Sequence, residues 1–162
     1  MSGCAEKKPW VFRVRVTDRA GALTSIASAF SNRGISVDTV VGHSRHLTNS
    51  DEGTVVVTFR CTEEEKDTIA RVVKRLSKVT SLTEHPYECK SLRKSAVVRV
   101  SRRLTPGDVV GKQMFLTCEP IQPSDHEGLY FLAGPASELD PILERFIQDG
   151  ILKDVVYSVL HL

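Results

Sequence analysis

The strongest structural signal in the sequence is VRVTDRAGAL, residues 14–23. Apolar residues alternate with polar ones from Trp10 to Val16, which predicts a half-buried strand. After Gly21 the apolar residues recur at helical spacing and predict an amphipathic helix, whose buried face would carry Leu23, Ile26, Ala27 and Phe30. A glycine at this turn lets a neighbour or ligand approach the backbone, and the free N–H groups of the first helical turn favour an anion such as a carboxylate. A tight turn without a ligand is the simpler interpretation, since one glycine turn is a weak motif.

Size, charge and cysteine content restrict the class of protein. The 162 residues suffice for one medium domain or two small ones, and a net charge of +2 gives no general attraction to nucleic acid or to an anionic membrane. No apolar stretch approaches the roughly 20 residues that span a bilayer, and the polar first nine residues have no signal-peptide character. The four cysteines form no C-x-x-C pair, and such isolated thiols fit a reducing compartment. We therefore expect a cytoplasmic protein without membrane contact.

The rest of the first half completes a βαββαβ order. Residues 35–41 and 54–60 are predicted strands, and residues 79–84 form a fourth. Thr62 and Glu65 have the spacing of a capping box. The helix that they open is predicted to bury Ile69, Val72, Val73 and Leu76.

A second module repeats this pattern with one element reduced. Its predicted strands span 95–100, 114–118, 129–133 and 155–160. A helix capped by Ser137 or Asp140, with Pro141 in its first turn, corresponds to the earlier capped helix at an offset of 75 residues. Residues 102–112 contain Pro106, Gly107 and Gly111, so the first helix of this module is predicted to be short or missing.

Two short motifs carry a resemblance to a known family. Asp18, Gly21 and Leu23 match a D-x-x-G-x-L signature, and residues 30–35 match F-x-x-R-G-I. The chain thus resembles the ACT domains, small βαββαβ modules that bind amino acids and regulate metabolic enzymes. Its tandem layout and length are similar to the small regulatory subunits of acetolactate synthase. The fold implied is α+β, with two ferredoxin-like ACT-type modules at residues 8–86 and 95–162 and a linker at 87–94.

The resemblance implies an effector site made of two groups of residues. The effector's carboxylate would bind the backbone N–H groups of Gly21, Ala22 and Leu23, beside Asp18 and Ala20. Its ammonium and side chain would meet Ser36, Val37 and Asp38 of a paired ACT module. Ser36 stands where feedback-sensitive members of the family usually have Asn.

The function implied is that of a non-catalytic, amino-acid-binding regulatory protein. It would be a homodimer, would need no cofactor, and would act on a catalytic subunit of an amino-acid biosynthetic enzyme such as acetolactate synthase. No nucleophile–base pair or phosphate-binding glycine motif is evident in the sequence. His43 and His46 supply only two of the four ligands of a structural zinc site, so no metal is expected.

Two other functions remain open at this level. The chain could be an ACT-like assembly protein that binds no ligand. The βαββαβ order also occurs in RNA-binding modules, and a basic run could contact phosphate: Lys90, Arg93, Lys94, Arg99, Arg102 and Arg103. Those modules need exposed aromatic residues on their central strands, whereas the third strand here has only Phe59, on its inward face. Nucleic acid is therefore not the expected partner.

Overall fold

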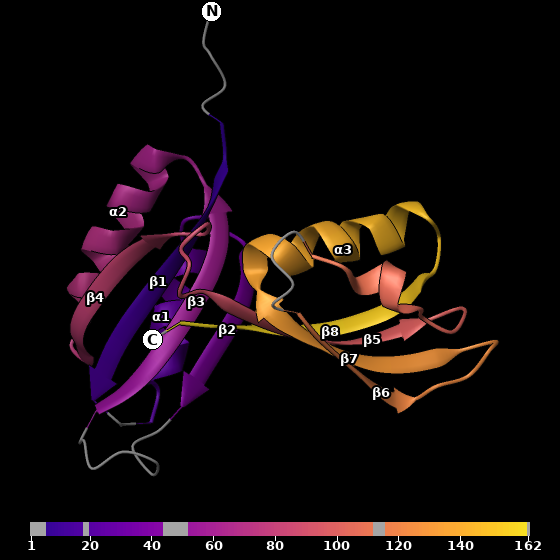
Figure 1. The fold of residues 1–162 in the computed structure, drawn as a ribbon. Coiled ribbons are helices and arrows are strands. Elements are labelled where there is room, and N and C mark those ends of the chain that lie inside the picture. Colours follow the sequence, from indigo (N-terminus) through magenta and orange to yellow (C-terminus); the bar gives the residue numbers. More distant parts are fainter. Residues whose placement is uncertain (1–5, 18–19, 44–51, 112–115, 162) are drawn as a thin grey trace, which may run out of the picture. The chain divides into compact units, whose positions relative to one another are not determined.

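A computed structural model describes residues 6–17, 20–43, 52–111 and 116–161. The chain divides into two compact units, residues 1–87 (unit 1) and 88–162 (unit 2), shown in Figure 1. Each unit has its own sheet and its own hydrophobic core. No helix in the described part of the chain is long and apolar enough to cross a membrane.

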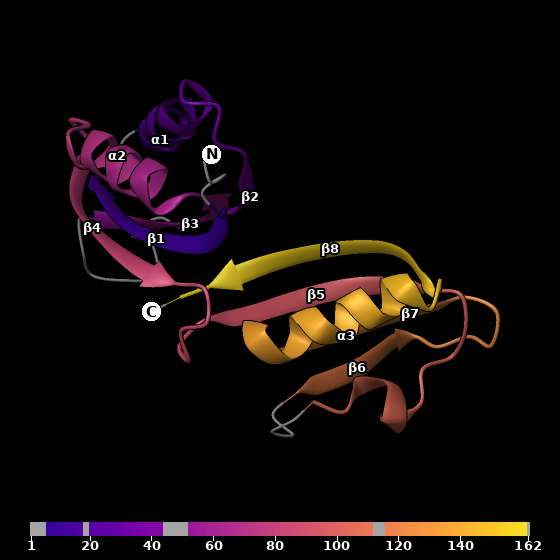
Figure 2. The ribbon, with the colours of Figure 1, turned by 90° about the horizontal axis from the view of Figure 1, so that it is seen from above.

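Unit 1 is a four-stranded antiparallel sheet with two helices on one face (Figure 2). Its strands follow the order β2-β3-β1-β4. The elements are β1 (Lys8–Thr17), α1 (Ala22–Ser31), β2 (Val37–His43), β3 (Glu52–Cys61), α2 (Glu63–Lys74) and β4 (Val79–Pro86). The predicted βαββαβ order is confirmed. β2 and β4 are the edge strands of this sheet.

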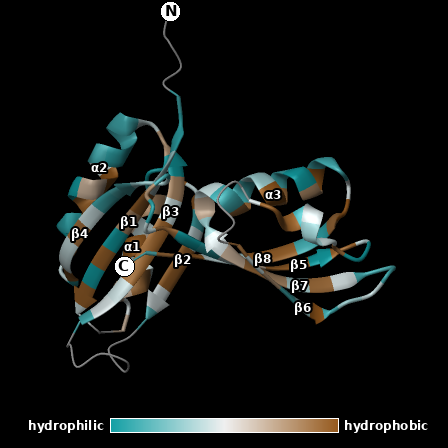
Figure 3. Cartoon of the chain, in the orientation of Figure 1, coloured by the Kyte–Doolittle hydropathy of each residue, from teal (hydrophilic) through white to brown (hydrophobic). Residues whose placement is uncertain are grey.

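Three phenylalanines form the centre of the unit 1 core. The ring of Phe59 on β3 lies edge-on to Phe12 on β1 and to Phe30 on α1, with centroid separations of 4.7 and 4.8 Å. All three side chains are fully buried, and Figure 3 shows the hydrophobic residues that run along β1 and β3. The alternation read from the sequence therefore places these strands correctly.

The buried face of α1 differs from the predicted one. Ile26 and Phe30 are buried as expected, but Leu23 is 48% exposed and Ala27 is exposed. Ala22 and Ala29 are buried in their place. The predicted and the observed buried sets both have helical spacing and share Ile26 and Phe30, so periodicity alone does not distinguish them. The packing orientation of α1 on the sheet determines which set is buried.

The start of α2 follows the sequence pattern closely. The Thr62 hydroxyl accepts a hydrogen bond from the Glu65 backbone N–H at 3.2 Å, and the Thr62 N–H donates to the Glu65 carboxylate at 2.9 Å. This reciprocal capping box satisfies two N–H groups that a helix leaves unpaired. Ile69 and Val73 are buried, whereas Val72 and Leu76 pack at the margin of the core.

Unit 2 repeats the arrangement with the sheet order β6-β7-β5-β8. Its elements are β5 (Arg93–Val100), the 3-10 helix η2 (Pro106–Val109), β6 (Thr117–Gln122), β7 (Gly128–Pro135), α3 (Ala136–Gln148) and β8 (Leu152–Leu160). η2 occupies the chain position that α1 has in unit 1. Two ferredoxin-like modules, the second with a shortened first helix, are therefore confirmed.

The start of β6 corrects the sequence prediction for unit 2. The strand predicted at 114–118 is β6, which begins at Thr117 and includes Pro120. β6 is an edge strand, where a proline without an N–H is tolerated. Residues 114 and 115 lie outside the described residues.

The predicted helix cap in unit 2 is wrong. α3 begins at Ala136 with Pro135 as its N-cap and has no side-chain cap. Pro141 therefore lies in the second turn, where its cost is offset by the buried apolar face of the helix. Asp140 is not a cap either, because it is the fifth residue of α3, and its carboxylate accepts a hydrogen bond from Lys94 Nζ at 2.5 Å.

Candidate functional site

The turn between β1 and α1 has the features of an anion site. Gly21 is the N-cap of α1 and has φ +85°, a conformation that favours glycine. A side chain would also be obstructed here, since a Cβ built on Gly21 would lie 2.8 Å from Lys78 Nζ. Lys78 donates a hydrogen bond of 2.6 Å to the Ala20 carbonyl. A lysine charge thus lies beside the N-terminus of α1.

Lys78 is a site residue that sequence reasoning did not find. It lies between the end of α2 at Lys74 and the start of β4 at Val79. The Thr17 N–H donates to the Lys78 carbonyl at 2.9 Å, which holds the residue against the end of β1. The pairing of β1 with β4, far apart in sequence, brings Lys78 to the turn.

A pocket of about 240 Å³ opens beside the turn. Predicted site residues Gly21, Ala22 and Leu23 line one side of it. The ends of β1, β2 and β3 line the rest, with Val16, Thr17, Gly42, His43, Gly53, Thr54 and Val55. This position explains why Leu23 is exposed. A larger hollow, about 540 Å³, also includes Gly21 and Lys78.

The remaining predicted site residues lie elsewhere. Val37 pairs with Phe59 at the start of β2, whereas His43 pairs with Thr54 at its end. The six residue steps from Val37 to His43 span about 20 Å of strand. Ser36, Val37 and Asp38 are therefore at the opposite end of β2 from the pocket, and Asp38 lies 3.9 Å from the Arg60 guanidinium. Asp18 is outside the described residues.

Comparison with known proteins identifies the first unit. Residues 10–79 match the ACT domain family. Unit 1 contains an ACT domain. No curated protein matches the chain.

The fold similarity to a solved structure extends beyond this ACT domain. The small subunit of acetolactate synthase from Thermotoga maritima is 15% identical, with a TM-score of 0.68 and coverage of 96% of both chains. The regulatory subunit of aspartate kinase from Thermus thermophilus is 16% identical, with a TM-score of 0.46 and coverage of 88% of this chain and 91% of that one. The first similarity shows that the two-module fold is shared across nearly the whole chain.

Half of the basic run after the ACT domain is paired with acidic side chains within unit 2. Arg99 lies 2.9 Å from the Glu127 carboxylate, and Arg102 lies 2.7 Å from Asp108. The Arg102 guanidinium and the Thr105 N–H and hydroxyl hold the pKa of Asp108 well below its usual range. Lys94 is buried and bonded to Asp140. The charges of these three basic residues are therefore engaged by carboxylates of the same unit.

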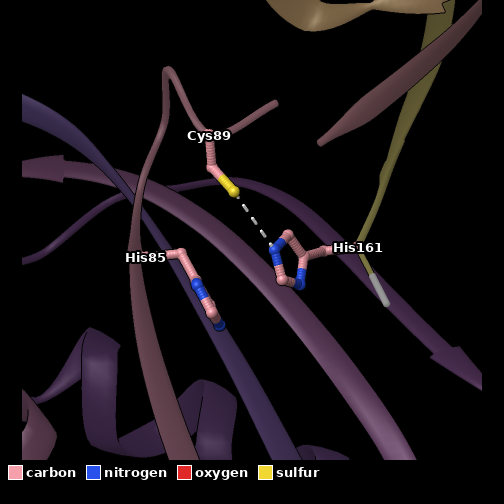
Figure 4. A group of neighbouring side chains, drawn as sticks. All are labelled: His85, Cys89 and His161. Atoms are coloured by element: carbon pink, nitrogen blue, oxygen red, sulfur yellow. Dashed lines mark hydrogen bonds between the residues drawn. The ribbon is translucent and has the colours of Figure 1, made fainter. Parts of the chain in front are cut away.

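A group of reactive side chains that the sequence did not reveal is present in unit 2 (Figure 4). Cys89 Sγ lies 3.6 Å from His161 Nε2, and the Ser91 hydroxyl lies 2.9 Å from both atoms. Cys89 and His161 are 72 residues apart, so no local motif predicts this nucleophile–base pair. His85, also drawn in Figure 4, belongs to unit 1, where its ring is hydrogen-bonded to Thr83.

Proposed function

We propose that this chain is a non-catalytic regulatory protein whose ACT domain binds an amino acid at the turn between β1 and α1. The observation that carries the proposal is the left-handed Gly21 beside Lys78 at the start of α1. The free N–H groups of the first turn, the helix dipole and the lysine charge all favour a carboxylate. The adjacent pocket offers space for the rest of a small ligand.

The proposed site is completed by a second copy of the chain. β2 is an edge strand with an exposed Val40 near its middle. If two β2 strands pair antiparallel about Val40, Val37 of the second copy lies opposite His43, at the pocket. Ser36 and Asp38 of the second copy then flank the same place, where Asp38 would meet the ligand's ammonium. Such pairing also removes an exposed sheet edge and gives a two-fold homodimer.

The proposed partner is a catalytic subunit of an amino-acid biosynthetic enzyme, with acetolactate synthase as the first candidate. The fold shared with the Thermotoga maritima small subunit supports this choice. A regulatory subunit works by favouring one conformation of its partner, and its effector must bind the two states with different affinity.

Ligand binding is tested by titration calorimetry of the pure protein against all common amino acids. We expect heat with at least one amino acid for the wild type and none for Gly21→Asp, which adds a side chain and a like charge to the anion site. Gly34→Ala is the matched control, because Gly34 also has positive φ, a Cβ added there would meet nothing within 4 Å, and the residue lies outside the pocket. Absence of heat with the wild type would favour the ligand-free assembly protein.

The dimer is tested by light scattering. We expect a mass of about 36 kDa, twice the chain mass of 18.0 kDa, for the wild type. Val40→Lys places a charge on the β2 edge and should give the monomer mass and lose amino-acid binding. A wild-type monomer at micromolar concentration, unchanged by ligand, contradicts the two-copy site.

The partner is tested with the catalytic subunit of acetolactate synthase from the same source. We expect the pure chain to have no synthase activity and to change the rate of the catalytic subunit, or its sensitivity to an amino acid. A pull-down with this chain from the native host is a second test. Recovery of RNA instead of a metabolic enzyme would contradict the regulatory function.

A further inference from the structure

Cys89 lies in the segment that connects β4 to β5, within a turn closed by a hydrogen bond of 3.0 Å from the Leu92 N–H to the Cys89 carbonyl. Its side chain is half-exposed, whereas His161, which follows β8, is buried. The Ser91 hydroxyl is hydrogen-bonded to the Cys89 sulfur and to His161 Nε2, both at 2.9 Å. The three groups therefore form a continuous hydrogen-bonded set that reaches solvent at the sulfur.

The surroundings of the sulfur favour its anionic form. The Ser91 hydroxyl and the backbone N–H groups of Ser91 and Leu92 donate to it and lower the pKa of the Cys89 thiol. The other described cysteines differ, since burial raises the pKa of Cys61 to about 11 and also raises that of Cys118. Thiol reactivity follows the thiolate and its exposure. Cys89 is thus distinguished from both by hydrogen bonding, and from the buried Cys61 also by access.

We propose that Cys89 is a modification site, a thiol activated by Ser91 and His161 that reacts with peroxides and small electrophiles. With hydrogen peroxide, the thiol proton passes to His161 Nε2, and the sulfur attacks one peroxide oxygen. An S–O bond forms and the O–O bond breaks. The departing hydroxide takes the proton from the imidazolium and leaves as water. Sulfur is oxidised to a sulfenic acid, and the peroxide is reduced.

The inference is independent of the effector site, because all three groups belong to unit 2 and the amino-acid pocket belongs to unit 1. It assigns His161 as the proton acceptor and Ser91 as a positioning residue. A nucleophile with a base within hydrogen-bond reach is the arrangement that activates thiols in general.

The test uses the full chain carrying Cys4→Ser, so that the remaining thiols are the three that the structure describes. Alkylation by iodoacetamide is followed across pH for each cysteine by mass spectrometry, in the folded protein and in urea. We expect Cys89 to react first in the folded protein, with a pH inflection below that in urea, while the buried Cys61 stays protected and Cys118, whose pKa is raised, reacts only at higher pH. Hydrogen peroxide followed by dimedone should give an adduct at Cys89.

Variants separate activation from mere exposure. Ser91→Ala should raise the inflection and slow alkylation near neutral pH by about threefold or more, since half a pKa unit changes the thiolate fraction about threefold. Ser91→Thr keeps the hydroxyl and should restore the wild-type profile, and His161→Asn should slow the peroxide reaction. Circular dichroism confirms that each variant is folded. An inflection equal to that in urea, or identical profiles for the Ala and Thr variants, overturns the proposal.

Discussion

Replacing Gly21 by alanine tests the geometry of the turn between β1 and α1. At φ +85° an L side chain costs about 1–2 kcal/mol of backbone strain. The new Cβ would also lie 2.8 Å from Lys78 Nζ and would displace this flexible side chain from the Ala20 carbonyl. The lost hydrogen bond adds about 0.5–1.5 kcal/mol. We therefore expect Gly21→Ala to lower the free energy of unfolding of unit 1 by about 1.5–3.5 kcal/mol.

Gly34→Ala isolates the contribution of Lys78. Gly34 has φ +65° with nothing within 4 Å of its Cβ position, so this variant should lose only the strain energy of about 1–2 kcal/mol. Urea unfolding followed by fluorescence reports on unit 1, because Trp10 on β1 is the only tryptophan of the chain. In a Lys78→Ala background the two glycine variants should become equally destabilising. If Gly21→Ala costs no more than Gly34→Ala in the wild-type background, the proposed crowding between Lys78 and the turn is refuted.

Three further predictions concern stability. Phe59→Ala removes the central ring of the unit 1 core and should cost about 3–5 kcal/mol in the same urea experiment; a loss below 1 kcal/mol would contradict its central place. Thr62→Ala removes the capping box and should cost about 1 kcal/mol, while Ser137→Ala should be nearly neutral because α3 has no side-chain cap; equal losses would refute this difference. The pKa of Asp108 is lowered by its bonds to Arg102 and Thr105. Its stabilising effect is therefore fully present above the unfolded-state pKa near 3.9, begins to decline below it, and is lost as pH falls through the lower folded-state pKa. The stability difference between wild type and Asp108→Asn, followed by circular dichroism, should shrink between pH 7 and pH 3, and a constant difference would contradict the pairing.

Local sequence patterns determined the elements of this protein. Alternation located β1 and β3, and the Thr62–Glu65 spacing identified the start of α2. Gly34 and Gly150 adopt the positive φ expected after a helix. These features depend on backbone preferences within a few residues, which is why one sequence suffices to predict them. The same reasoning failed at α3, where the packing of its apolar face keeps Pro141 inside the helix.

The residues of each candidate site are brought together only by the tertiary structure. Two antiparallel pairings, β1 with β4 and β5 with β8, bring Lys78 to the Gly21 turn and His161 to Cys89. Tertiary structure also determined which face of α1 is exposed. Two sets of apolar residues on this helix have equal periodicity, and only one set packs against the sheet. Side chains that meet across such distances in sequence are selected by strand register and by burial of apolar surface. Neither the strand register nor this burial can be predicted from residues that are neighbours in the sequence.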